Sequence, residues 1–249
     1  GKLLDMADEF GCEKIATGHY AQIVESDGHV YLANAVDGKK DQTYFLWMLT
    51  EANLARTVFP LGGYTKQQVR DMAAERGFVK LSQKTESQEI CFVPNNDYRD
   101  FLAQQVPNFD ETCKSGDFID KNGQVIGTHE GFPNYTIGQR KGLKVAFGKP
   151  KYVTRIDAAT NRVTLGDRDD LLTTTLEAGG CRFTDSQKLS MNPRVLARIR
   201  YKSPATAATI AIDGDRCRLL FDEPVWGVTP GQSLVLYQDG KVVGGGFID

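Results

Sequence analysis

One cysteine, Cys91, lies where a reactive thiol could serve, in the segment Gln88-Glu89-Ile90-Cys91-Phe92-Val93-Pro94. A lone cysteine between Ile90 and Phe92 is ordinarily a small core side chain. The polar residues before and after this segment, together with a predicted domain edge, favour an accessible thiol, and a reactive thiolate needs such access. The local sequence leaves both interpretations open.

A second candidate site is Gly18-His19-Tyr20. It directly follows residues 14–17, which have the composition of a short buried strand, and open α/β sheets bind ligands beyond the carboxyl ends of their strands. A histidine in that place could exchange protons or contact a phosphate. A tight turn with a solvent-exposed histidine explains the tripeptide equally well.

Basic residues recur in the segment 194–202. If this segment is a strand, Arg198, Arg200 and Lys202 share one face and apolar side chains share the other. Most such rows are solvated strand faces, but a second basic cluster, Gln139-Arg140-Lys141, favours phosphate binding. Because the net charge is only −2, nucleic-acid binding would have to rest on a local patch of this kind.

The first third of the chain has the pattern of an α/β domain. Apolar residues at helical spacing predict a helix over residues 3–10, ended by Gly11. A capping-box sequence at 65–68 predicts a second helix that ends at Gly77. Between them, residues 22–32 alternate around an Asp-Gly turn, as in a hairpin. Helices and short strands in this order indicate α/β architecture.

After Asn95 the pattern of predicted secondary structure changes from α/β to mainly β. One more helix is predicted from Asp97 to Gln105, and beyond it short β-rich runs alternate with Asn-Gly and Asp-Gly turns. The closely spaced strands after Leu171 predict a small antiparallel barrel or sandwich. We predict domain boundaries that divide the chain into residues 1–95, 96–168 and 169–249.

Composition excludes several classes of protein. The five cysteines are spread singly without C-x-x-C spacing and the three histidines lie far apart, so we expect neither a disulfide framework nor a metal site. No apolar run is long enough to span a bilayer and no secretory leader is visible. We therefore expect a cytoplasmic protein without a membrane partner.

Five short segments occur in the order found in the tRNA-specific 2-thiouridylase family, known as MnmA or TrmU, which this chain resembles over essentially its whole length. Each segment is weak evidence alone, and their common order makes the resemblance specific. The segments are Ala16-Thr17-Gly18-His19-Tyr20, Lys40-Asp41-Gln42-Thr43-Tyr44-Phe45, Ser87-Gln88-Glu89-Ile90-Cys91-Phe92, Thr136-Ile137-Gly138-Gln139-Arg140-Lys141-Gly142 and Thr229-Pro230-Gly231-Gln232-Ser233.

The resemblance implies the remnant of a Rossmann-like PP-loop ATPase domain with a helical insertion, then a small central β-rich domain, then a C-terminal antiparallel β-barrel. It also implies an enzyme that thiolates the wobble uridine of tRNA with ATP and magnesium, using sulfur from a cysteine desulfurase or a sulfur relay protein. Cys91 would be the catalytic residue that carries the persulfide, and Gly18 would lie at the ATP site. Contacts with tRNA would come from His19, Lys40, Asp41, Gln42, Arg200, Tyr201 and Gln232.

Two motifs of that family do not occur in the 249 residues. They are the Ser-Gly-Gly-x-Asp-Ser phosphate loop and the Asp-x-x-Cys segment, whose cysteine would resolve a disulfide with Cys91. Because the chain also opens inside a helical pattern without Met, we expect a fragment that is inactive alone. Two other functions stay open, namely another PP-loop sulfurtransferase and a non-catalytic RNA-binding module.

Overall fold

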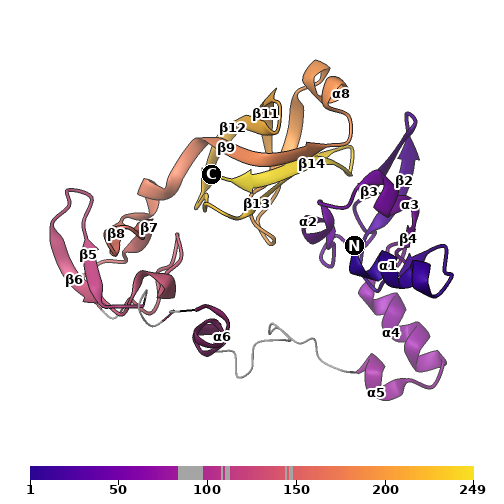
Figure 1. Ribbon diagram of the computed structural model, residues 1–249, viewed down its shortest axis with the longest axis horizontal. Coiled ribbons are helices and arrows are strands. Elements are labelled where there is room, and N and C mark those ends of the chain that lie inside the picture. Colours follow the sequence, from indigo (N-terminus) through magenta and orange to yellow (C-terminus); the bar gives the residue numbers. More distant parts are fainter. Residues whose placement is uncertain (84–97, 108, 110–112, 144, 146–147) are drawn as a thin grey trace. The chain divides into compact units, whose positions relative to one another are not determined.

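The computed structural model describes residues 1–83, 98–107, 109, 113–143, 145 and 148–249 (Figure 1). Cys91 and its motif lie outside the described residues. The chain forms two compact units. The first contains Gly1–Lys84, Thr174–Pro224 and Thr229–Asp249, and the second contains Thr85–Thr173 and Val225–Val228.

The α/β part of the first unit begins with helix α1 (Lys2–Glu9), and the chain leaves the helix at the predicted Gly11, where φ is +67°. Strands β1 (Ile15–Ala16) and β4 (Thr57–Val58) then pair in parallel. The intervening chain returns through the short helix α3 (Glu51–Ala55), as a parallel pair requires a crossover. Gly18 and His19 therefore follow the carboxyl end of a parallel strand.

Helix α4 (Lys66–Glu75) confirms the predicted capping box. The Thr65 hydroxyl accepts a hydrogen bond from the Gln68 backbone N–H, and the Gln68 side chain accepts one from the Thr65 backbone N–H. The chain turns at Gly77, where φ is +84°, into helix α5 (Val79–Ser82). Within the described ranges, no helix is both long and apolar enough to cross a membrane.

The predicted hairpin forms from β2 (Gln22–Ser26) and β3 (His29–Ala33), with positive φ at Asp27 and Gly28. The sequence did not indicate its second partner. Ala33 of β3 pairs with Lys241 of β14 (Lys241–Ile248), so the hairpin extends a sheet formed by the last third of the chain.

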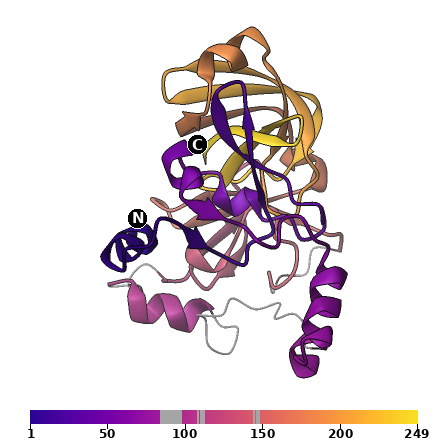
Figure 2. The same ribbon diagram turned by 90° about the vertical axis from the view of Figure 1, so that its right-hand side faces the viewer.

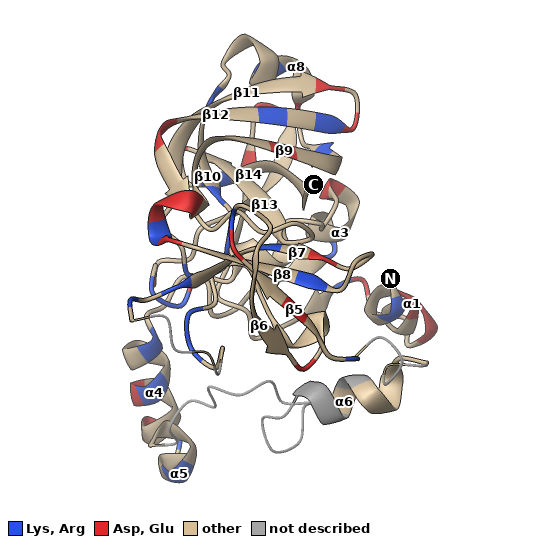
Figure 3. Cartoon of the chain, turned by 90° about the vertical axis from the view of Figure 1, so that its left-hand side faces the viewer, with Lys and Arg blue, Asp and Glu red and all other residues tan. Residues whose placement is uncertain are grey.

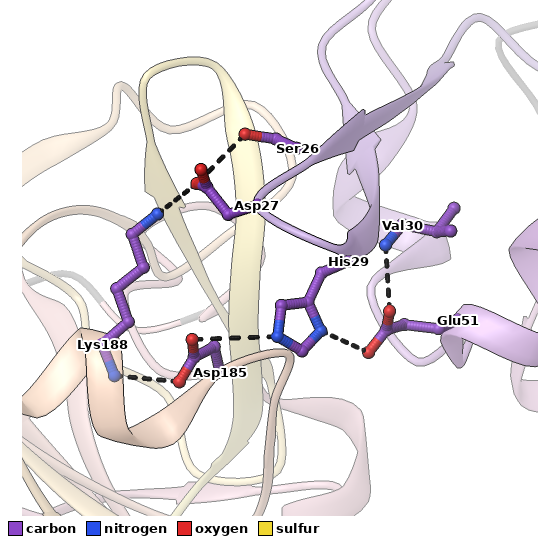
Figure 4. Close-up of polar contacts among 7 residues, drawn as sticks. All are labelled: Ser26, Asp27, His29, Val30, Glu51, Asp185 and Lys188. Carbon is purple, nitrogen blue, oxygen red and sulfur yellow. Dashed lines mark hydrogen bonds and ion pairs between the residues drawn. The ribbon is translucent and has the colours of Figure 1, made fainter.

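Polar side chains also fasten this hairpin (Figure 4). The His29 ring lies 3.0 Å from a Glu51 carboxylate oxygen and 3.8 Å from one of Asp185. Glu51 accepts a 2.9 Å bond from the Val30 backbone N–H, and this bond together with His29 holds the pKa of Glu51 below its usual value. Lys188 forms an ion pair with Asp27. His29 is thus engaged in holding the hairpin to neighbouring elements.

Six strands close into an antiparallel barrel in the order β13-β10-β11-β12-β9-β14, with β14 pairing back onto β13 (Figure 2). This result confirms the predicted C-terminal barrel. Closure removes free sheet edges from its circumference, and the inward side chains of Leu219, Leu234 and Leu236 are fully buried. The remaining bounds are β9 (Leu172–Phe183), α8 (Ser186–Met191), β10 (Arg194–Arg198), β11 (Thr206–Asp213), β12 (Arg216–Trp226) and β13 (Ser233–Gln238).

Gly245 in β14 lets Trp47, which directly follows helix α2 (Thr43–Leu46), approach the barrel. A Cβ atom on Gly245 would stand 2.6 Å from both the Leu234 carbonyl oxygen and Cε3 of Trp47. Real Cβ atoms do not approach so closely, and here one neighbour is backbone and the other a buried ring.

We therefore expect Gly245→Ala to lower the free energy of unfolding by about 1–3 kcal/mol, the usual range for overpacking a well-packed site. Urea unfolding followed by circular dichroism measures this change. Gly63→Ala is the matched control, since nothing lies within 4 Å of a Cβ at that position and the backbone is unstrained. Equal unfolding midpoints for the two variants would show that the Trp47 contact is not tight.

The second unit contains a four-stranded sheet in the order β6-β5-β8-β7, in which β5 and β8 run parallel and the other pairs antiparallel. Its core includes the fully buried Phe118, Val153 and Val163. This unit is the β-rich central part that the sequence predicts, preceded by the predicted helix α6 (Tyr98–Gln105). The other elements are β5 (Gly116–Ile119), β6 (Val125–His129), η2 (Phe132–Asn134), β7 (Tyr152–Asp157), β8 (Arg162–Gly166) and η3 (Arg168–Leu171).

Candidate nucleic-acid interface

The loop that contains Lys40, Asp41 and Gln42 is folded around the Asp41 carboxylate. This carboxylate is 2% exposed and accepts hydrogen bonds from the Ala35 backbone N–H at 2.8 Å and from the Thr43 hydroxyl at 2.5 Å. Lys40 and Gln42, on either side, are half-buried. Asp41 therefore points inward, and its predicted tRNA contact stays a prediction. What its surroundings support is the positioning of its two neighbours.

Asp41 also ties this loop to the barrel. Nη1 of Arg198, the last residue of β10, lies 3.6 Å from Oδ1 of Asp41, and its guanidinium lies 5.2 Å from the ring centroid of Tyr237. The Tyr237 hydroxyl is 3.1 Å from the Thr43 hydroxyl, and burial raises the pKa of Tyr237 to about 12. Only 22% of the Arg198 side chain is exposed. Arg198 thus serves mainly as the cationic partner of the buried Asp41.

The structure corrects the predicted basic row. Strand β10 ends at Arg198, and the chain then turns, with the Arg200 carbonyl accepting from both the backbone N–H and the hydroxyl of Ser203. The prediction that Arg198, Arg200 and Lys202 share one strand face is therefore wrong. Alternation continues only as far as the strand does, and Lys202 lies exposed in the turn.

Gln42 joins the same loop to the segment that contains His19. The Gln42 backbone N–H donates to the Tyr20 carbonyl at 2.9 Å, and the Tyr20 N–H donates to Gln42 Oε1 at 3.0 Å. The His19 ring is half-buried, 3.0 Å from the Thr17 hydroxyl and edge-on to Phe59. Gly18 is exposed. Two predicted contact segments, whose bonded residues Tyr20 and Gln42 are 22 positions apart, are therefore held together by one main-chain bond and one bond to the Gln42 side chain.

Gln232 lies in the loop that precedes β13. It is exposed, and its neighbour Ser233 holds helix α2 by accepting hydrogen bonds from the Tyr44 hydroxyl at 2.8 Å and from the Trp47 indole at 3.1 Å. At the other end of the loop, Thr229 accepts a 3.3 Å bond from Nη2 of Arg200. The loop thus contacts both α2 and the turn after β10.

Four segments far apart in the sequence consequently meet in the first unit, which we call the four-segment surface. It is formed by residues 18–20, 40–45, 198–202 and 229–233. Every predicted tRNA-contact residue belongs to it, and the contacts themselves stay predictions. The sequence interpretation missed Tyr44 and Phe45 as part of this surface, because the motif that contains them does not indicate which ring faces outward.

Charge over the rest of the molecule is mixed. Figure 3 shows basic and acidic residues interspersed along the barrel strands. On β12, for example, Arg216 pairs with Asp249 and Arg218 with Glu177. The other predicted cluster, Arg140 and Lys141, is exposed in the second unit. As expected from the low net charge, any attraction for nucleic acid has to be local.

Comparison with known proteins agrees with this architecture. Residues 1–95 match the family model described as tRNA methyl transferase HUP domain, residues 99–167 match the tRNA methyl transferase PRC-barrel domain, and residues 173–248 match the aminomethyltransferase beta-barrel domain. This order confirms the predicted fold class, in which a HUP-type α/β domain precedes a central β-rich domain and a C-terminal barrel.

Curated relatives share nearly the whole of this chain. The tRNA-specific 2-thiouridylase MnmA of Amoebophilus asiaticus is 43% identical over 99% of this chain and 66% of its own length. The corresponding proteins of Chlorobium chlorochromatii and Chlorobaculum tepidum are 44% and 46% identical, over 98% and 94% of this chain and 68% and 64% of their own lengths. The chain thus spans about two thirds of the length of these relatives. At this level of identity and coverage, it belongs to the tRNA-specific 2-thiouridylase family.

Proposed function

We propose that the protein serves in the 2-thiolation of the wobble uridine of tRNA, as a tRNA-uridine 2-sulfurtransferase in which Cys91 carries the sulfur. The observation that carries this proposal is the four-segment surface, where cations, a histidine and aromatic rings from distant parts of the chain gather. The names of the relatives, each a tRNA-specific 2-thiouridylase, support the same reaction.

In this proposal the four-segment surface binds the tRNA. Arg200, Lys202 and Lys40 supply positive charge for phosphates. His19, Gln42, Tyr201 and Gln232 supply hydrogen-bonding groups, and two of them, His19 and Tyr201, also supply aromatic rings. Single-stranded loops are read through such stacking and hydrogen-bonding contacts once their bases leave the stack. Asp41 would act through its neighbours, because its own carboxylate is engaged with Thr43 and Arg198.

Sulfur transfer would begin at Cys91. Its thiolate attacks the outer sulfur of a persulfide on a donor protein, so that a new S–S bond forms on Cys91 and the donor leaves as a thiolate. The outer sulfur of the Cys91 persulfide is then the nucleophile for C2 of the uridine, and the C2–O bond to the activated oxygen would break as the C2–S bond forms. A second thiol would then attack the sulfur of Cys91, so that a disulfide forms with Cys91 and the sulfur on C2 leaves as the thiouridine. A cysteine desulfurase or a sulfur relay protein fits the donor role, and we place the reaction in the cytoplasm.

ATP enters the proposal as the cosubstrate that would activate the uridine oxygen. Gly18 is exposed, and the 249 residues contain no Ser-Gly-Gly-x-Asp-Ser loop, so we infer that they do not hold a complete phosphate-binding site by themselves. No step through ATP follows from these residues. We infer that the 249 residues alone bind tRNA without completing thiolation.

Mass spectrometry of tRNA nucleosides tests the reaction. In cells whose gene for this protein is deleted, we expect 2-thiouridine derivatives at the wobble position to disappear, and the wild-type gene to restore them. The same measurement separates thiolation from the methyl transfer named in two of the family-model descriptions. An unchanged amount of 2-thiouridine would overturn the proposal.

A non-catalytic RNA-binding module is the second candidate, since the four-segment surface is complete in a chain that holds no phosphate loop. This function predicts that a gene with Cys91→Ser restores every tRNA-dependent property of the deleted strain. The proposed enzyme predicts that this variant restores none of the 2-thiouridine.

A further inference from the structure

Phe45 is the most exposed ring of the four-segment surface. It lies in helix α2, where its neighbours Thr43, Tyr44 and Trp47 are buried, yet 58% of Phe45 is exposed. A single exposed phenyl group is common on proteins and needs no explanation alone. What distinguishes Phe45 is the set of groups that fix it in place.

Two aromatic side chains hold the Phe45 ring. Its centroid lies 4.3 Å from that of Tyr201, with the planes inclined by 43°, and 5.7 Å from that of Tyr44, edge to face. Tyr44 is anchored through its hydroxyl to the Ser233 carbonyl. Tyr201 stands in the turn closed by the bonds between Arg200 and Ser203. Phe45 therefore presents a pre-positioned aromatic surface, whose ordering costs little on binding.

Positive charge borders this ring cluster. Arg200 directly precedes Tyr201, and its Nη2 donates a 3.3 Å bond to the Thr229 hydroxyl, in the same loop whose Ser233 carbonyl accepts from the Tyr44 hydroxyl. Burial raises the pKa of Tyr44, and the charge of Arg200 opposes that rise. Lys202 is exposed one residue beyond Tyr201. A flat aromatic surface with cations at its rim matches a nucleotide, in which a flat base is joined to a phosphate.

We propose that Phe45 and Tyr201 form a stacking platform for one unpaired base of the bound RNA, with Arg200 placed for the adjoining phosphate. The platform rests on the proposed function, because it assumes that the four-segment surface binds tRNA. An apolar segment of a protein partner would suit the phenyl ring but would bring no negative charge to the cations at the rim.

Phe78 provides a matched control. It is 56% exposed, almost the same as Phe45, but among the described residues it has no ring or cation contact. Phe45→Leu removes the aromatic face while keeping an apolar side chain, Phe45→Tyr keeps the face, and Phe78→Leu removes an equally exposed ring elsewhere.

The first measurement is the affinity of the chain for a fluorescein-labelled hairpin RNA with the sequence of a tRNA anticodon stem–loop. Base–aromatic stacking predicts that Phe45→Leu weakens binding about tenfold. Phe45→Tyr and Phe78→Leu should bind as the wild type does. Equal affinity of Phe45→Leu and wild type would overturn the platform, as would equal losses in Phe45→Leu and Phe78→Leu.

The second measurement identifies the base. A series of the same hairpins, each lacking one loop base, is bound to wild type and to Phe45→Leu. At the stacked position the missing base should weaken wild-type binding about tenfold and leave the variant unchanged, because both changes remove the same contact. Additive losses at every position would overturn the platform while RNA binding stands. If the wild-type chain binds no hairpin and no whole tRNA, both the proposed function and the platform fail.

Discussion

Cys91→Ser is expected to abolish transfer of sulfur from a cysteine desulfurase to this chain. A serine hydroxyl is not ionised at neutral pH and forms no persulfide, so the loss should be complete rather than partial. The chain is incubated with the desulfurase and ³⁵S-labelled cysteine, and protein-bound label is measured after non-reducing electrophoresis. This assay requires neither ATP nor tRNA, and it therefore tests the sulfur step apart from the rest of the reaction.

The other cysteines provide the controls. Cys12 is exposed and Cys113 partly so, which makes both thiols accessible to label. Cys181 and Cys217 are buried in the barrel with their sulfurs 3.5 Å apart, so Cys12→Ser and Cys113→Ser are the informative variants. We expect both to keep the label that Cys91→Ser loses. Retention of label by Cys91→Ser, together with its loss from either control, would move the sulfur carrier to another residue.

Local signals made much of the fold predictable. The Thr65 capping box, the Asp27-Gly28 turn and the glycine after α1 specify their elements through bonds within a few residues, and each formed as predicted. The barrel was also predictable in outline, because closely spaced strands with tight turns permit few architectures. The boundaries at residues 95 and 168 stay predictions.

Contacts between segments far apart in the chain could not be predicted from the sequence. Alternation suggested that Arg198 and Arg200 share a face, but the strand ends at Arg198 and the chain turns between Arg200 and Ser203. The Asp41 motif suggested a surface carboxylate, whereas pairing with Arg198, 157 residues away in the chain, places it inside. The same limit applies to Phe45, whose outward orientation depends on how α2 meets the barrel.

The position of Arg198 decides how RNA binding should be tested. Replacing it would leave the buried Asp41 carboxylate without its cation, and an uncompensated buried charge is strongly destabilising. A loss of RNA affinity in that variant could not be separated from a loss of structure. Arg200 and Lys202 are the better choice, because they lie in the turn after β10, beyond the strand residue Arg198 that neutralises the buried Asp41.

The double variant Arg200→Gln, Lys202→Gln is expected to weaken tRNA binding about tenfold or more near physiological salt. Each phosphate contact that is lost should also reduce the steepness of log K against log salt concentration by about 0.7–0.9. Filter binding or fluorescence anisotropy over a series of salt concentrations gives both quantities. Thr229→Val, which removes only the hydroxyl that accepts from Arg200, should leave the salt dependence unchanged.

Arg216→Gln, Arg218→Gln is the control for net charge. It also removes two positive charges, so the change in net charge is equal. These charges lie on β12, where each arginine pairs with a carboxylate. If long-range attraction dominated, both double variants would lose affinity and slope equally, and the four-segment surface would not be the phosphate-binding site. If only the Arg200 and Lys202 variant loses affinity and slope, the phosphates lie at the four-segment surface. Counterion release depends on which basic residues contact phosphates, and not on the net charge of the protein.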